Sequence, residues 1–195
     1  MTGKHSDPAA FAGRLSRPPH SSSGPQRPEA SAGSPDAESC EEFDIRIARD
    51  GTWFYHGSPI TRKPLVKLFA SVLRRDEHGE YWLQTPVEKG RIRVDDAPFL
   101  AVELTVSGEG RAQELAFRTN LDDVVIAGPG HHIRVSHGDD SDEPRPYIAV
   151  RDRLDALISR PVFYQLVELG EEVAGPPPGF GVWSRGEFFA LGRLA

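Results

Sequence analysis

Positive charge gathers in one short segment of the sequence, where Arg62, Lys63 and Lys67 follow Thr61. The Thr61 hydroxyl predicts a helix N-cap, which places Arg62 and Lys63 in the first turn. The helix dipole disfavours a cation there by about 0.3–1 kcal/mol, whereas the free N–H groups and the dipole together favour a bound anion. The segment therefore predicts either a phosphate-type anion site or a solvated basic helix face that pairs with acidic residues of the second half.

A second segment repeats this charge placement. Ile158-Ser159-Arg160-Pro161 matches Ile60-Thr61-Arg62-Lys63-Pro64 in offering a hydroxyl, then an arginine, then a first-turn proline. A match this short also arises by chance. We expect two β-plus-helix units that pack together and hold a small anionic ligand between them. The candidate ligand-binding residues are His56, Ser58, Thr61, Arg62, Lys63, Lys67 and Arg160.

Other polar clusters give weaker signals. The pairs Asp95-Asp96 and Asp122-Asp123 suggest a hard metal such as magnesium, but neighbours in a strand point to opposite faces, and Asp is ordinary in turns. His131, His132 and His137 are more typical of loop histidines than of a zinc site. The glycine pairs Gly108/Gly110 and Gly128/Gly130 are not followed by a predicted helix, so neither fits a dinucleotide-binding or P-loop motif. The sequence also contains no Gly-x-Ser-x-Gly nucleophile elbow. The sequence therefore predicts no metal, no cofactor and no catalytic residue.

Hydrophobic periodicity predicts the elements that position these residues. Phe43–Ala48 alternates apolar and polar residues and, with Thr52–His56, forms a hairpin. An apolar stripe after Thr61 predicts a helix that Asp76–Gly79 closes. Further strands are expected at Tyr81–Thr85, Arg91–Asp95, Phe99–Val106, Leu115–Thr119, Asp123–Ala127, His132–Ser136 and Tyr147–Val150. We expect a loop at Asp139–Pro146, a mostly helical segment at Arg153–Leu169 and a small aromatic hairpin near Trp183.

Composition bounds the fold and the partners. Few large apolar residues occur in the first forty of 195 residues, so residues 1–41 are expected to be disordered. The remaining chain divides into a hairpin, helix and strand unit (42–97), a sheet-plus-helix unit (98–170) and a Pro-rich linker with an aromatic tail (171–195). The net charge of −6 argues against nucleic-acid and anionic-membrane binding. No apolar run approaches the length of a membrane span, so we expect a cytoplasmic protein.

Five segments carry a resemblance to a known family: DGTWFYHGSPI, LVKLFASVL, TPVEKGRIRVDDAPF, FRTNLDDVVIAG and RPYIAVRDRLDALISRPVFYQLVE. Together they resemble the bacterial family known as domain of unknown function 1285, over roughly Phe43 to Glu168. The resemblance implies a duplicated α+β fold whose C-terminal half is loosely like pleckstrin-homology domains. It also implies a nucleotide-like ligand between the halves and a role in signal transduction.

From these observations we expect an α+β fold of two β-rich units, each with a helix. The expected function is non-catalytic binding of a small phosphorylated or nucleotide-like ligand between them. One alternative is an enzyme acting on such a ligand with help from Asp95, Asp96 or Asp122. Another is a protein-interaction module that uses the C-terminal half and its aromatic tail.

Overall fold

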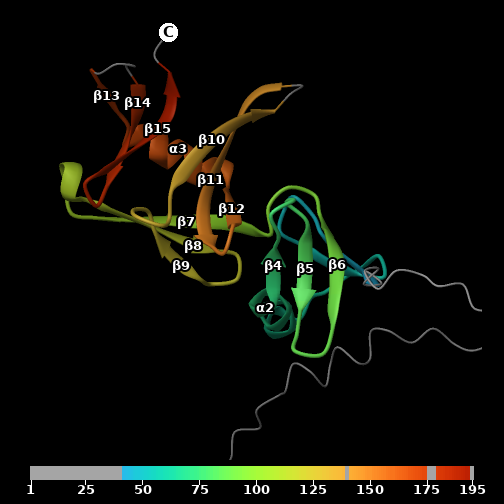
Figure 1. Ribbon diagram of the computed structural model, residues 1–195. Coiled ribbons are helices and arrows are strands. Elements are labelled where there is room, and N and C mark those ends of the chain that lie inside the picture. The colour runs from blue at the N-terminus through green and yellow to red at the C-terminus, as the bar shows by residue number, and fades with distance from the viewer. Residues whose placement is uncertain (1–40, 139–140, 175–178, 194–195) are drawn as a thin grey trace, which may run out of the picture.

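The computed structural model describes residues 41–138, 141–174 and 179–193. The described chain forms two six-stranded sheets, a three-stranded sheet and two α-helices (Figure 1). The expected tail of residues 1–41 lies outside the described residues except for Glu41, which begins the first strand. The Pro-rich linker at residues 176–178 lies outside them as well.

The first unit is a six-stranded sheet with one helix. Its elements are β1 (Glu41–Ile47), β2 (Trp53–Tyr55), β3 (Ser58–Pro59), α2 (Lys63–Ser71), β4 (Leu73–Arg75), β5 (Tyr81–Gln84) and β6 (Lys89–Val94). The strand order is β3-β2-β1-β6-β5-β4, and β1 runs parallel to β6 while the other neighbours are antiparallel. Phe43, Ile45 and Ile47 are buried, as the alternating sequence predicts.

The second unit repeats that strand order. Its elements are β7 (Phe99–Ser107), the 3-10 helix η1 (Gly110–Ala112), β8 (Glu114–Thr119), β9 (Val124–Ile126), β10 (Ile133–Gly138), β11 (Ser141–Arg151), β12 (Leu154–Ile158) and α3 (Arg160–Glu168). The order β9-β8-β7-β12-β11-β10 again consists of two three-stranded meanders. They join through parallel pairing of the first and last strands, β7 and β12.

The helices do not occupy equivalent places in the two units. Helix α2 connects the third and fourth strands of its unit, whereas α3 follows the sixth strand of the second unit. The repeated feature is therefore the sheet, and the short match around Arg62 and Arg160 does not mark equivalent positions. Ser159 is an N-cap as expected, but the N-cap of α2 is Arg62, so the prediction for Thr61 was wrong by one residue.

Two further sequence predictions need correction. The segment expected to be helical from Arg153 begins as β12, because Leu154, Ala156 and Ile158 are buried in alternation, which is a strand period. The three residues of β4 were assigned to the end of the first helix, although they pair with β5. The expected loop at Asp139–Pro146 is in large part strand β11; residues 139–140 lie outside the described part of the chain.

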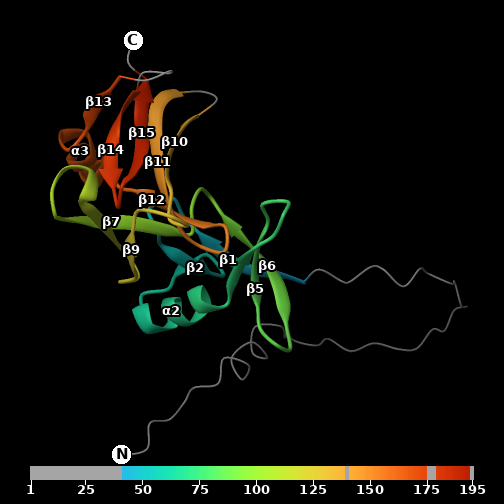
Figure 2. The same ribbon diagram turned by 60° about the vertical axis from the view of Figure 1, so that its left-hand side comes forward.

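The last sheet consists of β13 (Glu171–Val173), β14 (Gly179–Ser184) and β15 (Glu187–Arg193). It confirms the aromatic hairpin, whose turn residues Arg185 and Gly186 both have positive φ, as two-residue hairpins favour. The buried Ser184 ties it to the second unit: its hydroxyl donates to the carbonyl of Ala127 at 2.7 Å and accepts from the amide of Leu115 at 3.1 Å. Figure 2 shows this sheet beside β10 and β11, far from α2.

A single apolar core runs through the described chain. In the first unit Val66, Phe69 and Ala70 of α2 are buried, and the Phe69 ring stacks on Trp53 of β2 at 6.3 Å. Neither described helix is long and apolar enough to cross a membrane.

Two glycines of the last sheet give a matched test of its packing. A Cβ at Gly181 would collide with the backbone carbonyl oxygen of Phe189, whereas a Cβ at Gly192 meets no atom within 4 Å. We expect Gly181→Ala to lower the free energy of unfolding by about 1–3 kcal/mol, because a backbone group must move to admit the methyl. Gly192→Ala in the same sheet should change it little. Thermal unfolding of both variants checks this, and equal melting temperatures would contradict the described register.

Candidate functional site

The parallel pairing of β1 with β6 creates the junction between the two units. Parallel strands end at the same edge of a sheet, so the turn after β1 and the segment after β6 lie together. The amide of Asp95 donates to the carbonyl of Ile47 at 2.9 Å and fixes this edge. The pairing brings Arg49 of the turn to Asp96 of the connecting segment, with 3.5 Å between Arg49 Nε and Asp96 Oδ2.

Asp95 and Asp96 point in different directions, as expected for neighbours in extended chain. Asp95 stays within the first unit and accepts hydrogen bonds from Arg46 Nε, at 2.9 Å to Oδ1. These hydrogen bonds and the charge of Arg46 hold the pKa of Asp95 below its usual value. Asp96 faces the second unit, and the Tyr147 hydroxyl of β11 donates to its Oδ1 at 2.7 Å.

A cleft of about 520 Å³ lies at this junction. The first unit contributes Arg49 and Asp50, the connecting segment contributes Asp96, and the second unit contributes residues of β7, β11, β12 and the start of α3. Leu100, Leu157, Ile158, Phe163, Pro144 and Pro146 give the cleft an apolar lining. Its size falls in the range of small-molecule sites, about 300–1,000 Å³.

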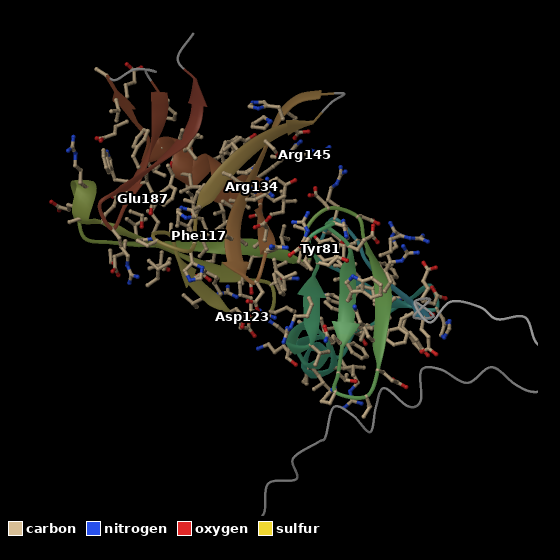
Figure 3. The ribbon with its side chains drawn as sticks, in the orientation of Figure 1. Tyr81, Phe117, Asp123, Arg134, Arg145 and Glu187 are labelled. Atoms are coloured by element: carbon tan, nitrogen blue, oxygen red, sulfur yellow. The ribbon has the colours of Figure 1, made fainter. Side chains whose placement is uncertain are left out.

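Three arginines and three carboxylates line this cleft, and most of them are already engaged. Arg160, at the first position of α3, forms an ion pair with Glu143. Asp50 accepts a hydrogen bond from the amide of Thr52 at 2.9 Å. Half-buried Arg145 has no carboxylate partner among the described residues, so its charge is open to a ligand. Figure 3 shows Arg145 toward the outer end of β11, with Tyr81 where the two units meet.

The structure places the cations of α2 at another part of the junction. Lys63 and Lys67 both bind the carboxylate of Asp122, with Nζ to oxygen distances of 2.7 and 2.9 Å. Asp122 belongs to the turn between β8 and β9 and also lies 3.6 Å from Arg118. The hydrogen bonds from the two lysines lower the pKa of Asp122 to about 2. The second of the two sequence interpretations, pairing with an acid of the second half, is the one that this geometry shows.

The remaining candidate residues do not gather with these lysines. His56 and Gly57 form the turn between β2 and β3, both with positive φ, and His56 Nδ1 lies 2.9 Å from Asp44 Oδ2. Ser58 lies in exposed β3. Thr61 precedes the N-cap Arg62, which makes no side-chain capping bond. No described cleft unites these residues with Arg160, which lines the cleft with Arg49. Lys67 lines a separate hollow of about 320 Å³ that also includes Arg151.

Sequence reasoning did not single out Arg49, Arg145 or Tyr147, and it considered Asp96 as a metal ligand or as an acid that assists an enzyme. Within the described ranges, no group of three or more acidic, His or Cys side chains is arranged to hold a metal. The histidines that were considered as ligands are held separately. His131 Nδ1 lies 3.0 Å from the carbonyl of Ala149, and His132 lies 3.0 Å from Glu187.

The shared carboxylate of Asp122 gives a prediction with a definite sign. Because its folded-state pKa of about 2 lies below the ordinary 3.8, its ion pairs stabilise the fold above about pH 4 and lose this effect toward pH 2. Asn tolerates the left-handed backbone of Asp122, so Asp122→Asn removes the charge alone. The melting temperature of the variant should lie below wild type above pH 4, and the two should converge near pH 2.

Ionic strength provides the control for this measurement. The Asp122 side chain is 44% exposed, so salt should screen its attraction to the lysines and narrow the difference between wild type and variant. A difference that persists unchanged at pH 2 and at high salt would show that the carboxylate acts through something other than its charge.

Comparison with known proteins places these features in a family. Residues 34–97 match the model described as Domain of unknown function (DUF1285), N-terminal domain, and residues 98–191 match Protein of unknown function (DUF1285), C-terminal domain. The boundary at 97/98 falls between Asp96 and β7, at the junction that the cleft occupies. No curated protein matches the chain.

Two solved structures are similar to this chain. A DUF1285 family protein from Silicibacter pomeroyi DSS-3 is 51% identical, with a TM-score of 0.74, over 79% of this chain and 82% of that one. A DUF1285 family protein from Shewanella baltica OS155 is 28% identical, with a TM-score of 0.48, over 63% of this chain and 89% of that one. With both domain models matched in succession, the chain belongs to the DUF1285 family.

Proposed function

We propose that this chain is a non-catalytic binding protein that holds a small phosphorylated or nucleotide-like ligand in the cleft between its two units. In this proposal it acts in the cytoplasm as part of a signalling process. The observation that carries the proposal is Arg145, a half-buried arginine that has no carboxylate partner among the described residues and lines a cleft of about 520 Å³.

Two other properties of the cleft support such a ligand. Its apolar side chains offer a surface for a ring or another flat apolar body. The first turn of α3 borders it, and free N–H groups at a helix start favour an anion. Arg guanidinium groups bind phosphate through two parallel hydrogen bonds, which suits Arg145 to this role.

Two of the three acids named for the enzymatic alternative, Asp95 and Asp122, are held outside the cleft, whereas Asp96 lines it. Asp95 is held by Arg46, and Asp122 is held by two lysines, so neither carboxylate is placed to activate a ligand. This arrangement favours binding over catalysis.

A protein-interaction module is the second candidate, and α3 supplies the observation that favours it. Its side chains Tyr164 and Val167 are 63% and 39% exposed, and Leu169 next to the helix is 37% exposed. A likeness of the second unit to pleckstrin-homology domains belongs to this candidate, since its sheet is followed by a C-terminal helix. Absence of anion binding would make this surface the leading candidate.

AMP and adenosine form a probe pair that differs only in the phosphate. We expect AMP to bind more tightly than adenosine, and Arg145→Gln to weaken AMP binding by at least about tenfold, because a hydrogen bond to a charged group contributes about 1.5–3 kcal/mol. Arg93→Gln, which removes an exposed arginine of β6 outside the cleft, is the matched control and should bind like wild type. Isothermal titration calorimetry measures all three proteins. Equal affinity for AMP and adenosine in the wild type would refute the proposal.

A further inference from the structure

Asp96 is a charged residue in an unusual position. Its side chain is only 7% exposed, at the point where the two units meet. A buried carboxylate is costly unless hydrogen bonds or a counter-charge compensate for lost water. The contacts of its two oxygens therefore indicate what this residue does.

One oxygen is fixed by the second unit. The Tyr147 hydroxyl donates to Asp96 Oδ1 at 2.7 Å, and the Arg134 guanidinium lies 4.2 Å from the centre of the Tyr147 ring. Burial raises the pKa of Tyr147, and the hydrogen bond and charge of Asp96 raise it further. The phenol thus remains a protonated donor at neutral pH, and the orientation of the carboxylate is set.

The other carboxylate oxygen, Oδ2, faces the Arg49 guanidinium. Asp96 Oδ2 is buried and accepts no hydrogen bond among the described residues, while Arg49 Nε lies 3.5 Å away. Arg49 and Asp96 therefore form an ion pair, but the distance between their atoms exceeds that of a normal N–H···O hydrogen bond, which extends to about 3.2 Å. The Arg49 side chain is 62% exposed, so the rest of its guanidinium can meet a ligand while Nε faces Asp96.

The backbone beneath Arg49 is held from both units. The amide of Gly51 donates to the carbonyl of Ala48 at 2.9 Å, and Asn120 Nδ2 of the second unit donates to the carbonyl of Gly51 at 3.3 Å. The stem of Arg49 therefore starts from a fixed turn, and Asp96 governs where its charged end points.

We propose that Asp96 and Tyr147 are positioning residues that aim Arg49 at the anionic group of the ligand in the junction cleft. This inference rests on the proposed function and deepens it by identifying a second anion-binding arginine and the groups that orient it. Arg49 comes from the first unit, Asp96 from the connecting segment and Tyr147 from the second unit. Ligand binding through Arg49 thus requires the two units to keep their mutual orientation.

A double-mutant cycle with AMP as the probe tests the positioning role. We expect Arg49→Gln to weaken AMP binding at least tenfold and Tyr147→Phe to weaken it about three- to tenfold. In the Arg49→Gln background, Tyr147→Phe should have no further effect, because its target is gone. If Tyr147→Phe instead only disturbed the local structure, it would lower the affinity for AMP by the same factor in the wild-type and Arg49→Gln proteins.

Tyr81→Phe is the matched control, since Tyr81 also lies at the junction, under Arg75, but its hydroxyl makes no described hydrogen bond. It should bind AMP like wild type. If Tyr147→Phe fails to fold, Asp96→Asn supplies the second variant: its amide keeps an acceptor for Tyr147 but loses the charge that attracts Arg49. Asp96→Asn should weaken AMP binding in the wild-type protein but have no further effect in the Arg49→Gln background.

The outcomes separate this inference from the proposed function. Tighter binding of AMP than adenosine, with no loss in Arg49→Gln or with equal losses in both backgrounds, overturns the positioning role and leaves the cleft as the binding site. No preference for AMP over adenosine in the wild type overturns the proposed function and this inference with it. Loss of binding that depends on Arg49 supports both.

Discussion

The parallel pairing of first and last strands is the constraint on which the rest of this structure depends. Each unit consists of two antiparallel meanders, and the pairs β1–β6 and β7–β12 join them into one sheet. In the first unit this pairing makes two distant segments end at one edge, which brings Arg49 to Asp96. In the second unit β12 lies against β7, so α3 starts beside the same junction and Arg160 lines the cleft. Without the parallel pairs, the cleft would lose both of its walls.

Local patterns in the sequence predicted most strands but not their partners. The alternation in Phe43–Ile47 and the hairpin around Arg185-Gly186 depend on neighbours in sequence, so side-chain period and turn chemistry suffice to find them. The strand at Leu154–Ile158 is short, mostly apolar and directly followed by α3, so its sequence also fits a helical segment. Short apolar runs of this kind do not distinguish the two by periodicity alone. The three residues of β4 follow a helix directly, and only their pairing with β5 identifies them as a strand.

Of the candidate ligand-binding residues predicted from the sequence, Arg160 lines the junction cleft, whereas Lys63 and Lys67 pair with Asp122. The sequence predicted a ligand between two units, and the junction cleft is lined by the turn after β1, the connecting segment, β7, β11, β12 and the start of α3. It gave no sign that Arg49 and Asp96 would meet, since 47 positions separate them and their contact requires the β1–β6 pairing. Tyr147 was assigned to a strand, but its face and its partner Asp96 follow only from the tertiary structure. The short match around Arg62 and Arg160 predicted equivalent helices in the two units, but α2 and α3 occupy non-equivalent positions.

Charge compensation decides which cations remain for a ligand. A cation at a helix start needs an anion nearby, and both helices find one within the chain: Asp122 binds Lys63 at α2, and Glu143 binds Arg160 at α3. Within the described part of the chain, Arg145 has no carboxylate partner, and Arg49 forms an ion pair with Asp96 that is longer than a hydrogen bond. Position at a helix start is therefore not enough to leave a cation free for a ligand, because the chain itself supplies an anion at each of these helices. An arginine that lines a cleft while its own counter-charge is absent or incompletely engaged is the stronger criterion, and Arg49 and Arg145 both meet it in the cleft between the units.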